Sequence, residues 1–101
     1  KLMSKPTIVA ISSLQEGDLQ RQREDYAAVC CAIQNIQLAA WSIGVGIQWS
    51  TGPITLEPNT YQVLGMDSNN EYMVGFLYMG YPQVKPEPKR KQFDCFLRYT
   101  P

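Results

Sequence analysis

A Trp-Ser-Thr-Gly run, Trp49 to Gly52, holds the residues of this 101-residue chain that are best suited to receive a flat ligand. The indole of Trp49 offers an aromatic wall, and the hydroxyls of Ser50 and Thr51 can donate or accept hydrogen bonds. The glycine lets the backbone come close to a bound group. The run therefore predicts one wall of a cofactor site, although a half-buried core aromatic is the plainer interpretation of Trp49.

A basic cluster at Lys89, Arg90 and Lys91 is the second candidate. Residues 85–101 include five basic and two acidic side chains, whereas residues 1–84 include four basic and seven acidic ones. A basic tail on an acidic body could bind a phosphate or dock on a neighbouring chain. A solvated charge run in a flexible arm is the alternative interpretation.

Several classes of chemistry are excluded by the residue types that the chain lacks. It has no histidine, so a Ser-His dyad and an imidazole general base are absent. The adjacent Cys30 and Cys31 would diverge by about 100° on a helix, so a disulfide framework is not expected. Without histidine or a Cys-x-x-Cys motif, the ligand set of a structural zinc site is also missing. We therefore predict no metal site and no hydrolytic chemistry.

The overall charge and hydropathy exclude other partners. Nine basic residues balance nine acidic ones, which is not the charge of a general binder of nucleic acids or anionic membranes. The sequence contains no run of about 18 apolar residues and no secretory hydrophobic segment. These features predict a cytoplasmic protein that binds neither nucleic acid nor membrane.

Extended segments surround the two candidate regions. β-branched residues 7–12 favour a strand, and residues 46–49 have an extended pattern. Residues 72–79 are apolar on both faces, which is typical of an interior strand. Prolines make the first half of 84–101 an extended arm, and alternation over 93–98 predicts an edge strand that needs a partner sheet.

A long helical pattern runs from about residue 21 to residue 43 and ends at Gly44. Its second half has few polar positions, so we expect most of its circumference to be buried. Its alanines permit close helix contacts, and ordinary core packing and a subunit interface both remain open. We expect Gly44 and Gly46 to adopt positive φ in the turn that follows.

A shorter helix is predicted after a loop between Pro53 and Pro58. Asn59 or Thr60 would cap it, with Asn59 placed to open a capping box, and it would end at Leu64. Two turns are the most that this segment can form.

Four segments, in this order and spacing, resemble the C-terminal part of the flavin-dependent nitroreductases. They are the helix AAVCCAIQNIQLAAWSIGVG, the WSTG run, the strand segment GMDSNNEYMVGFLYMGYP and the Lys-Arg-bearing tail. The likeness is closest to small single-domain members with a Trp-x-Ser/Thr-Gly loop, and it extends to the opening KPTIVAIS. It identifies residues 1–101 as the C-terminal portion of one nitroreductase-like domain, with 84–101 as its extended arm.

The resemblance implies an α+β fold, with a central mixed sheet surrounded by helices in an intertwined homodimer. Two FMN molecules would lie at the subunit interface, and each arm would add a strand to its partner's sheet. The family reaction is a ping-pong reduction, in which NAD(P)H delivers hydride to flavin N5 and a nitroaromatic, quinone or similar acceptor then takes the electrons. No side chain is assigned a catalytic role, since the chemistry takes place on the flavin.

The resemblance also assigns cofactor contacts by position. Trp49, Ser50, Thr51 and Gly52 would lie along the isoalloxazine, and Lys89 and Arg90 would approach the FMN phosphate. The spacing Lys-Arg-Lys departs from the more usual Lys-x-Arg. The Arg-x-Ser-x-Arg segment that grips the phosphate in the family's N-terminal half is missing, so tight FMN binding is not expected of these 101 residues alone.

Two other functions remain open from the sequence. The chain could be a cofactor-free helical dimerisation fragment with no activity of its own, or part of a related flavin enzyme with another acceptor, such as a dehalogenase. Burial of Trp49 and Thr51 against the chain's own residues, with no cleft beside them, would favour the cofactor-free interpretation.

Overall fold

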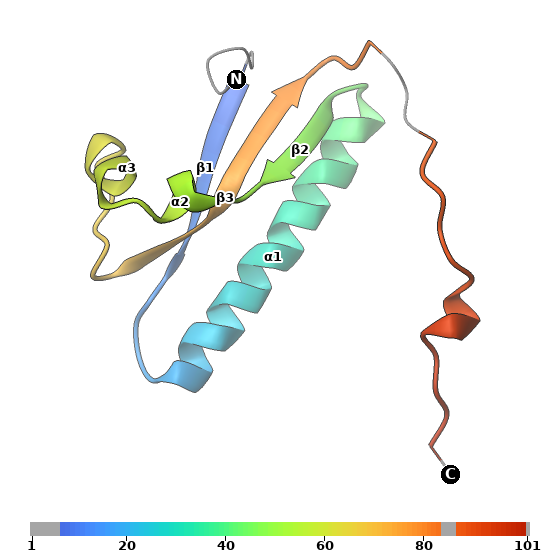
Figure 1. Ribbon diagram of the computed structural model, residues 1–101, viewed down its shortest axis with the longest axis horizontal. Helices are drawn as coiled ribbons and strands as arrows, with labels where there is room; N and C mark the ends of the chain where they lie inside the picture. Colours follow the sequence, from blue (N-terminus) through green and yellow to red (C-terminus); the bar gives the residue numbers. More distant parts are fainter. Residues whose placement is uncertain (1–6, 84–86, 101) are drawn as a thin grey trace.

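A three-stranded antiparallel sheet organises the computed structural model, which describes residues 7–83 and 87–100 (Figure 1). The strands are β1 (Thr7–Leu14), β2 (Gly46–Ser50) and β3 (Glu71–Gly80), in the order β1-β3-β2. The prediction of an interior strand is confirmed, because β3 lies between the other two and residues 73–77 are buried. All described strands pair antiparallel, so the parallel pairing of a mixed sheet is not formed among them.

One face of the sheet is covered by the long helix α1 (Leu19–Ser42), which contacts all three strands. Ile33 of α1 is fully buried against Val74 and Leu77 of β3. The opposite face carries a second cluster, in which Tyr61 packs with Met73 and Phe76. The core is thus divided into two small clusters, one on each side of β3.

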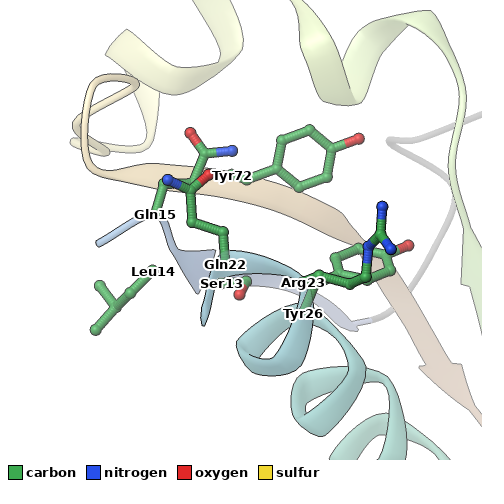
Figure 2. A pocket seen from close by; sticks show the side chains of 7 residues that line it. All are labelled: Ser13, Leu14, Gln15, Gln22, Arg23, Tyr26 and Tyr72. Atoms are coloured by element: carbon green, nitrogen blue, oxygen red, sulfur yellow. The ribbon is translucent and has the colours of Figure 1, made fainter. Parts of the chain in front are cut away.

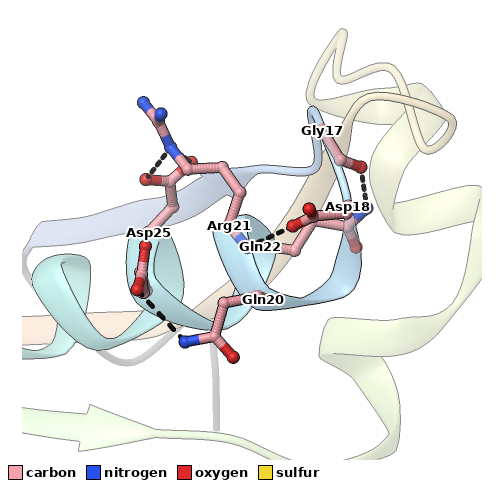
Figure 3. Close-up of polar contacts among 7 residues, drawn as sticks. Gly17, Asp18, Gln20, Arg21, Gln22 and Asp25 are labelled. Carbon is pink, nitrogen blue, oxygen red and sulfur yellow. Dashed lines mark hydrogen bonds and ion pairs between the residues drawn. The ribbon is translucent and has the colours of Figure 1, made fainter.

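Local hydrogen bonds explain why α1 begins two residues before the predicted start (Figure 3). Asp18 is the N-cap, and its Oδ1 accepts a hydrogen bond from the Arg21 N–H at 2.9 Å. The Gln22 side chain donates to the Gly17 carbonyl at 3.1 Å. In the next turn, Arg21 Nε pairs with Asp25 Oδ1 at 3.0 Å. These contacts set the first turn of the helix.

The prediction that most of the α1 circumference is buried is wrong for this chain. Ile33 is the only buried residue of α1, while Leu38 of α1 and Ile43, directly after the helix, are 60% and 75% exposed. The reason is geometric, since a single sheet face covers only one stripe of a helix. Leu38 of α1 and Ile43 after it therefore remain exposed apolar side chains in the isolated chain.

The turn after α1 bears out one glycine prediction and overturns the other. Gly44 has φ +84°, as predicted for the residue that ends the helix. Gly46 does not have a positive φ, because it already pairs with Gly80 at the start of β2. Its backbone is held by the sheet and not by a turn.

The predicted short helix is confirmed as α3 (Pro58–Val63), which has Leu64 as its C-cap. The predicted loop between Pro53 and Pro58 instead contains a second short helix, α2 (Pro53–Leu56). The predicted cap at Asn59 or Thr60 is wrong. Glu57 is the N-cap of α3 and makes no side-chain hydrogen bond. The helix starts here because Pro58 suits the first helical position, where a backbone N–H would have no partner within the helix.

The C-terminal arm contains a single short turn among its described residues, the 3-10 helix η2 (Phe93–Cys95). The prediction of an edge strand over 93–98 is wrong in this chain, since the segment meets no sheet edge and bonds locally, Cys95 N–H to the Gln92 carbonyl at 3.1 Å. Residues 87–100 are exposed, and Figure 1 shows them running apart from the sheet. Residues 84–86 and 101 of the predicted arm lie outside the described residues.

No helix within the described ranges has the length and apolar character needed to cross a membrane.

Candidate functional site

The WSTG loop, residues 49–52, leads from the end of β2 into α2. Gly52 has φ +140°, a conformation that favours glycine. Its carbonyl accepts hydrogen bonds from the Thr55 hydroxyl at 2.7 Å and from the Thr55 N–H at 3.0 Å. Thr55 is buried, so these bonds hold the turn from the inside. The loop has a defined shape before any ligand is present.

Trp49 is seated on the sheet by a glycine in the neighbouring strand. Its indole N–H donates to the Val74 carbonyl at 3.4 Å, and its ring lies over Gly75. A Cβ on residue 75 would overlap the indole Nε1 and would lie 2.9 Å from the Ser50 carbonyl. Gly75 is the residue that the sequence reasoning missed, although a glycine inside an apolar strand is a known sign of close backbone approach.

The register of the sheet explains why Gly75 is available. Ile11 pairs with Gly75 and Ser12 pairs with Met73, so β3 has an extra residue, Val74, at a β-bulge. The bulge lies directly beside the position of the Trp49 ring. A local irregularity of β3 thus creates the seat for the predicted aromatic wall.

The two hydroxyls of the loop differ in exposure. Thr51 is exposed, whereas Ser50 is partly buried and its Oγ lies 3.5 Å from the Thr51 carbonyl. Burial of both Trp49 and Thr51 would have favoured a loop without a cofactor. Trp49 is partly buried against the chain's own residues, but Thr51 is not. Four surface cavities of 270 to 380 Å³ in the described part of the chain are lined by other residues.

Lys89 and Arg90 are fully separate from this loop in the isolated chain. Both are exposed, and the one ion pair found among the described residues is between Arg21 and Asp25. Figure 1 shows the arm that carries the basic pair on the far side of α1 from α2. The chain alone does not bring the two predicted groups of site residues together.

Comparison with known proteins establishes the class of this fold. The sequence matches the Nitroreductase family over residues 1–81, and the chain belongs to that family. It is 37% identical over 78 residues to YfhC of Bacillus subtilis (strain 168) and 31% identical over 78 residues to YdjA of Escherichia coli (strain K12). Both relatives carry the name of an NAD(P)H nitroreductase. The alignments cover 76% and 77% of this chain but only 40% and 42% of the relatives.

Solved structures confirm the nitroreductase-like α+β fold. A nitroreductase-like family protein from Bacillus cereus superposes with a TM-score of 0.88 at 29% identity, covering 97% of this chain and 52% of that one. A nitroreductase from Desulfovibrio desulfuricans, solved in complex with FMN, has a TM-score of 0.76 at 21% identity and is covered to 54%. At that identity the second likeness shows the fold alone. The chain spans about half of each of these proteins.

Proposed function

We propose that the protein containing this chain is an FMN-dependent NAD(P)H oxidoreductase that reduces nitroaromatics, quinones or similar acceptors in a ping-pong cycle. Membership of the Nitroreductase family carries the proposal. The names of YfhC and YdjA and the FMN bound to the Desulfovibrio protein support it. Bound FMN would supply the redox chemistry, while the protein positions the rings and excludes competing reactions.

The WSTG loop fits the isoalloxazine side of such a site. Trp49 is held in place by the Val74 carbonyl and by the space above Gly75, so it presents a preformed aromatic surface. Thr51 is exposed beside it and can turn its hydroxyl toward a polar edge of the cofactor. We assign Trp49, Ser50, Thr51 and Gly52 to the cofactor site on this basis.

The basic pair would serve a second subunit. We propose that Lys89 and Arg90 contact the FMN phosphate, as two cations that have no ion-pair partner among the described residues. Because they lie away from the loop of their own chain, the site requires an intertwined homodimer in which the arm reaches the partner. The exposed Leu38 of α1 and Ile43 directly after it provide apolar side chains for the same association.

Coverage of the neighbours supports a further assignment. The chain accounts for 52% of the Bacillus cereus structure while matching it over almost its own full length. We therefore propose that residues 1–101 are the C-terminal portion of a single nitroreductase-like domain, with 84–101 as the arm.

The decisive experiment is the flavin content of the full-length protein. We expect visible absorbance near one FMN per chain, bleaching on anaerobic addition of NADH or NADPH, and recovery of the absorbance when a quinone is added. We also expect a dimer by analytical ultracentrifugation. Protein that stays colourless after incubation with FMN and removal of the excess would contradict the proposal and favour the cofactor-free dimerisation fragment.

A further inference from the structure

A cavity of 310 Å³ lies beyond the end of β2, where β3 pairs only with β1 (Figure 2). It is formed by the end of β1, the start of β3 and the first two turns of α1. None of the residues of the proposed flavin site contributes to it. Its volume is at the lower end of the range of small-molecule sites, roughly 300–1,000 Å³.

Ser13 lines this cavity with a hydroxyl that the fold does not satisfy. The residue is 3% exposed, and its Oγ has no hydrogen-bond partner. A buried hydroxyl without a partner costs free energy, so each one needs an explanation. The neighbouring Ser12 shows the usual solution, since its Oγ donates to Glu71 Oε1 at 2.8 Å. Ser13 is one of the residues that line the cavity, so its unpaired hydroxyl is the natural group to bond a ligand there.

Arg23 brings a cation to the same cavity. It has no ion pair within the described ranges, whereas Arg21, two residues earlier, is paired with Asp25 (Figure 3). The other carboxylates nearby on the chain also have partners: Asp18 accepts from the Arg21 N–H, and Glu24 accepts from Gln20. The guanidinium of Arg23 is therefore available to an external anion.

Two tyrosines give the cavity an aromatic side. Tyr26 of α1 and Tyr72 of β3 meet edge to face, with ring centroids 6.0 Å apart and planes at 68°. An ordinary tyrosine is already neutral at neutral pH and does not repel an anion. A hydrogen bond to Cys30 raises the pKa of Tyr26 further. The amide groups of Gln15 and Gln22 complete the polar rim.

We propose that this cavity binds a small aromatic carboxylate. The carboxylate would pair with the Arg23 guanidinium and accept a hydrogen bond from Ser13, and the ring would pack against Tyr26 and Tyr72. A cation, an unused hydroxyl and an aromatic wall are the three groups that such a molecule needs. The proposal does not depend on flavin binding.

The test uses the full-length protein and para-fluorobenzoate, observed by fluorine NMR. We expect saturable binding that leaves the visible absorbance of any bound flavin unchanged. Arg23→Gln should weaken the affinity by about tenfold or more, as expected for hydrogen bonds to a charged group. The matched variant Arg21→Gln should leave the affinity unchanged, because Arg21 does not line the cavity. Ser13→Ala should also weaken binding.

Three results would overturn the proposal. The first is no binding of para-fluorobenzoate to the wild-type protein, which includes the case in which another part of the protein fills the cavity. The second is equal affinity in the Arg23→Gln and Arg21→Gln variants, which would place the probe elsewhere. The third is equal binding of the neutral para-fluorobenzyl alcohol, which would show that the cavity does not recognise a carboxylate.

Discussion

Trp49 and Ser13 both carry a polar group on the α1 side of the sheet, and the fold treats them in opposite ways. The Trp49 N–H is paired with the Val74 carbonyl and its ring is seated over Gly75. The Ser13 hydroxyl is more deeply buried than Trp49 and has no partner. The loop at Trp49 therefore contributes a preformed shape with its hydrogen bond already made, whereas the cavity at Ser13 contributes a hydroxyl that can still form one.

The largest effect is expected from filling the seat of Trp49. Gly75→Ala should lower the free energy of unfolding by about 1–3 kcal/mol, because the new methyl overlaps the indole and crowds the Ser50 carbonyl. Gly46→Ala is the matched control, since its Cβ would meet neighbours at an ordinary 3.6 Å. Urea denaturation of the full-length protein measures both. Equal stability of the two variants would show that Trp49 is not tightly seated.

The second effect contrasts two adjacent serines on opposite faces of β1. Ser12→Ala removes the hydrogen bond to Glu71 and should destabilise the protein by about 1 kcal/mol. Ser13→Ala removes an unsatisfied hydroxyl and should leave stability unchanged or raise it by up to about 1 kcal/mol. Thermal denaturation without added carboxylate is the measurement. Destabilisation by Ser13→Ala would mean that this hydroxyl has a partner in the full-length protein.

The smallest effect concerns the exposed hydroxyl of the WSTG loop. Thr51→Val keeps the shape of the side chain and should weaken FMN binding by about 0.5–1.5 kcal/mol, the value of one hydrogen bond. Thr7→Val, an exposed threonine on β1, is the control and should not change FMN affinity. Titration of the apoprotein with FMN, followed by flavin fluorescence, compares them. Unchanged affinity and redox behaviour in the Thr51 variant would remove Thr51 from the site.

The predictions that the structure confirmed concern features set by residues adjacent in the sequence. The apolar run that became β3 and the positive φ of Gly44 follow from side-chain pattern and from the backbone freedom of glycine. The failures occurred where a partner outside the segment decides the outcome. Residues 93–98 have the alternation of a strand, but a strand needs a free sheet edge, and the isolated chain provides none to this segment.

In the candidate site too, some features follow from neighbouring residues in the sequence and others from contacts between distant ones. The residue types of Trp49, Ser50 and Thr51 and their order singled out the loop as a candidate, and the resemblance of four segments, of which the loop is one, named the family. The seat of Trp49 was not predictable, because it depends on a bulge that places Gly75 under the indole from a strand 26 residues further along the chain. The separation of Lys89 and Arg90 from the loop also emerged only in three dimensions.

The amino-acid sequence was enough to name the family, through the resemblance of four segments to known members. It was also enough for the interior strand, the end of the long helix and the exclusion of histidine chemistry, since these follow from local periodicity and composition. Only the three-dimensional contacts show that the Trp49 N–H has a hydrogen-bond partner while the Ser13 hydroxyl has none, and that Leu38 of α1 stays exposed. The physical reason is that burial and hydrogen-bond pairing of a side chain are set by contacts between residues distant in the chain, which no local pattern specifies.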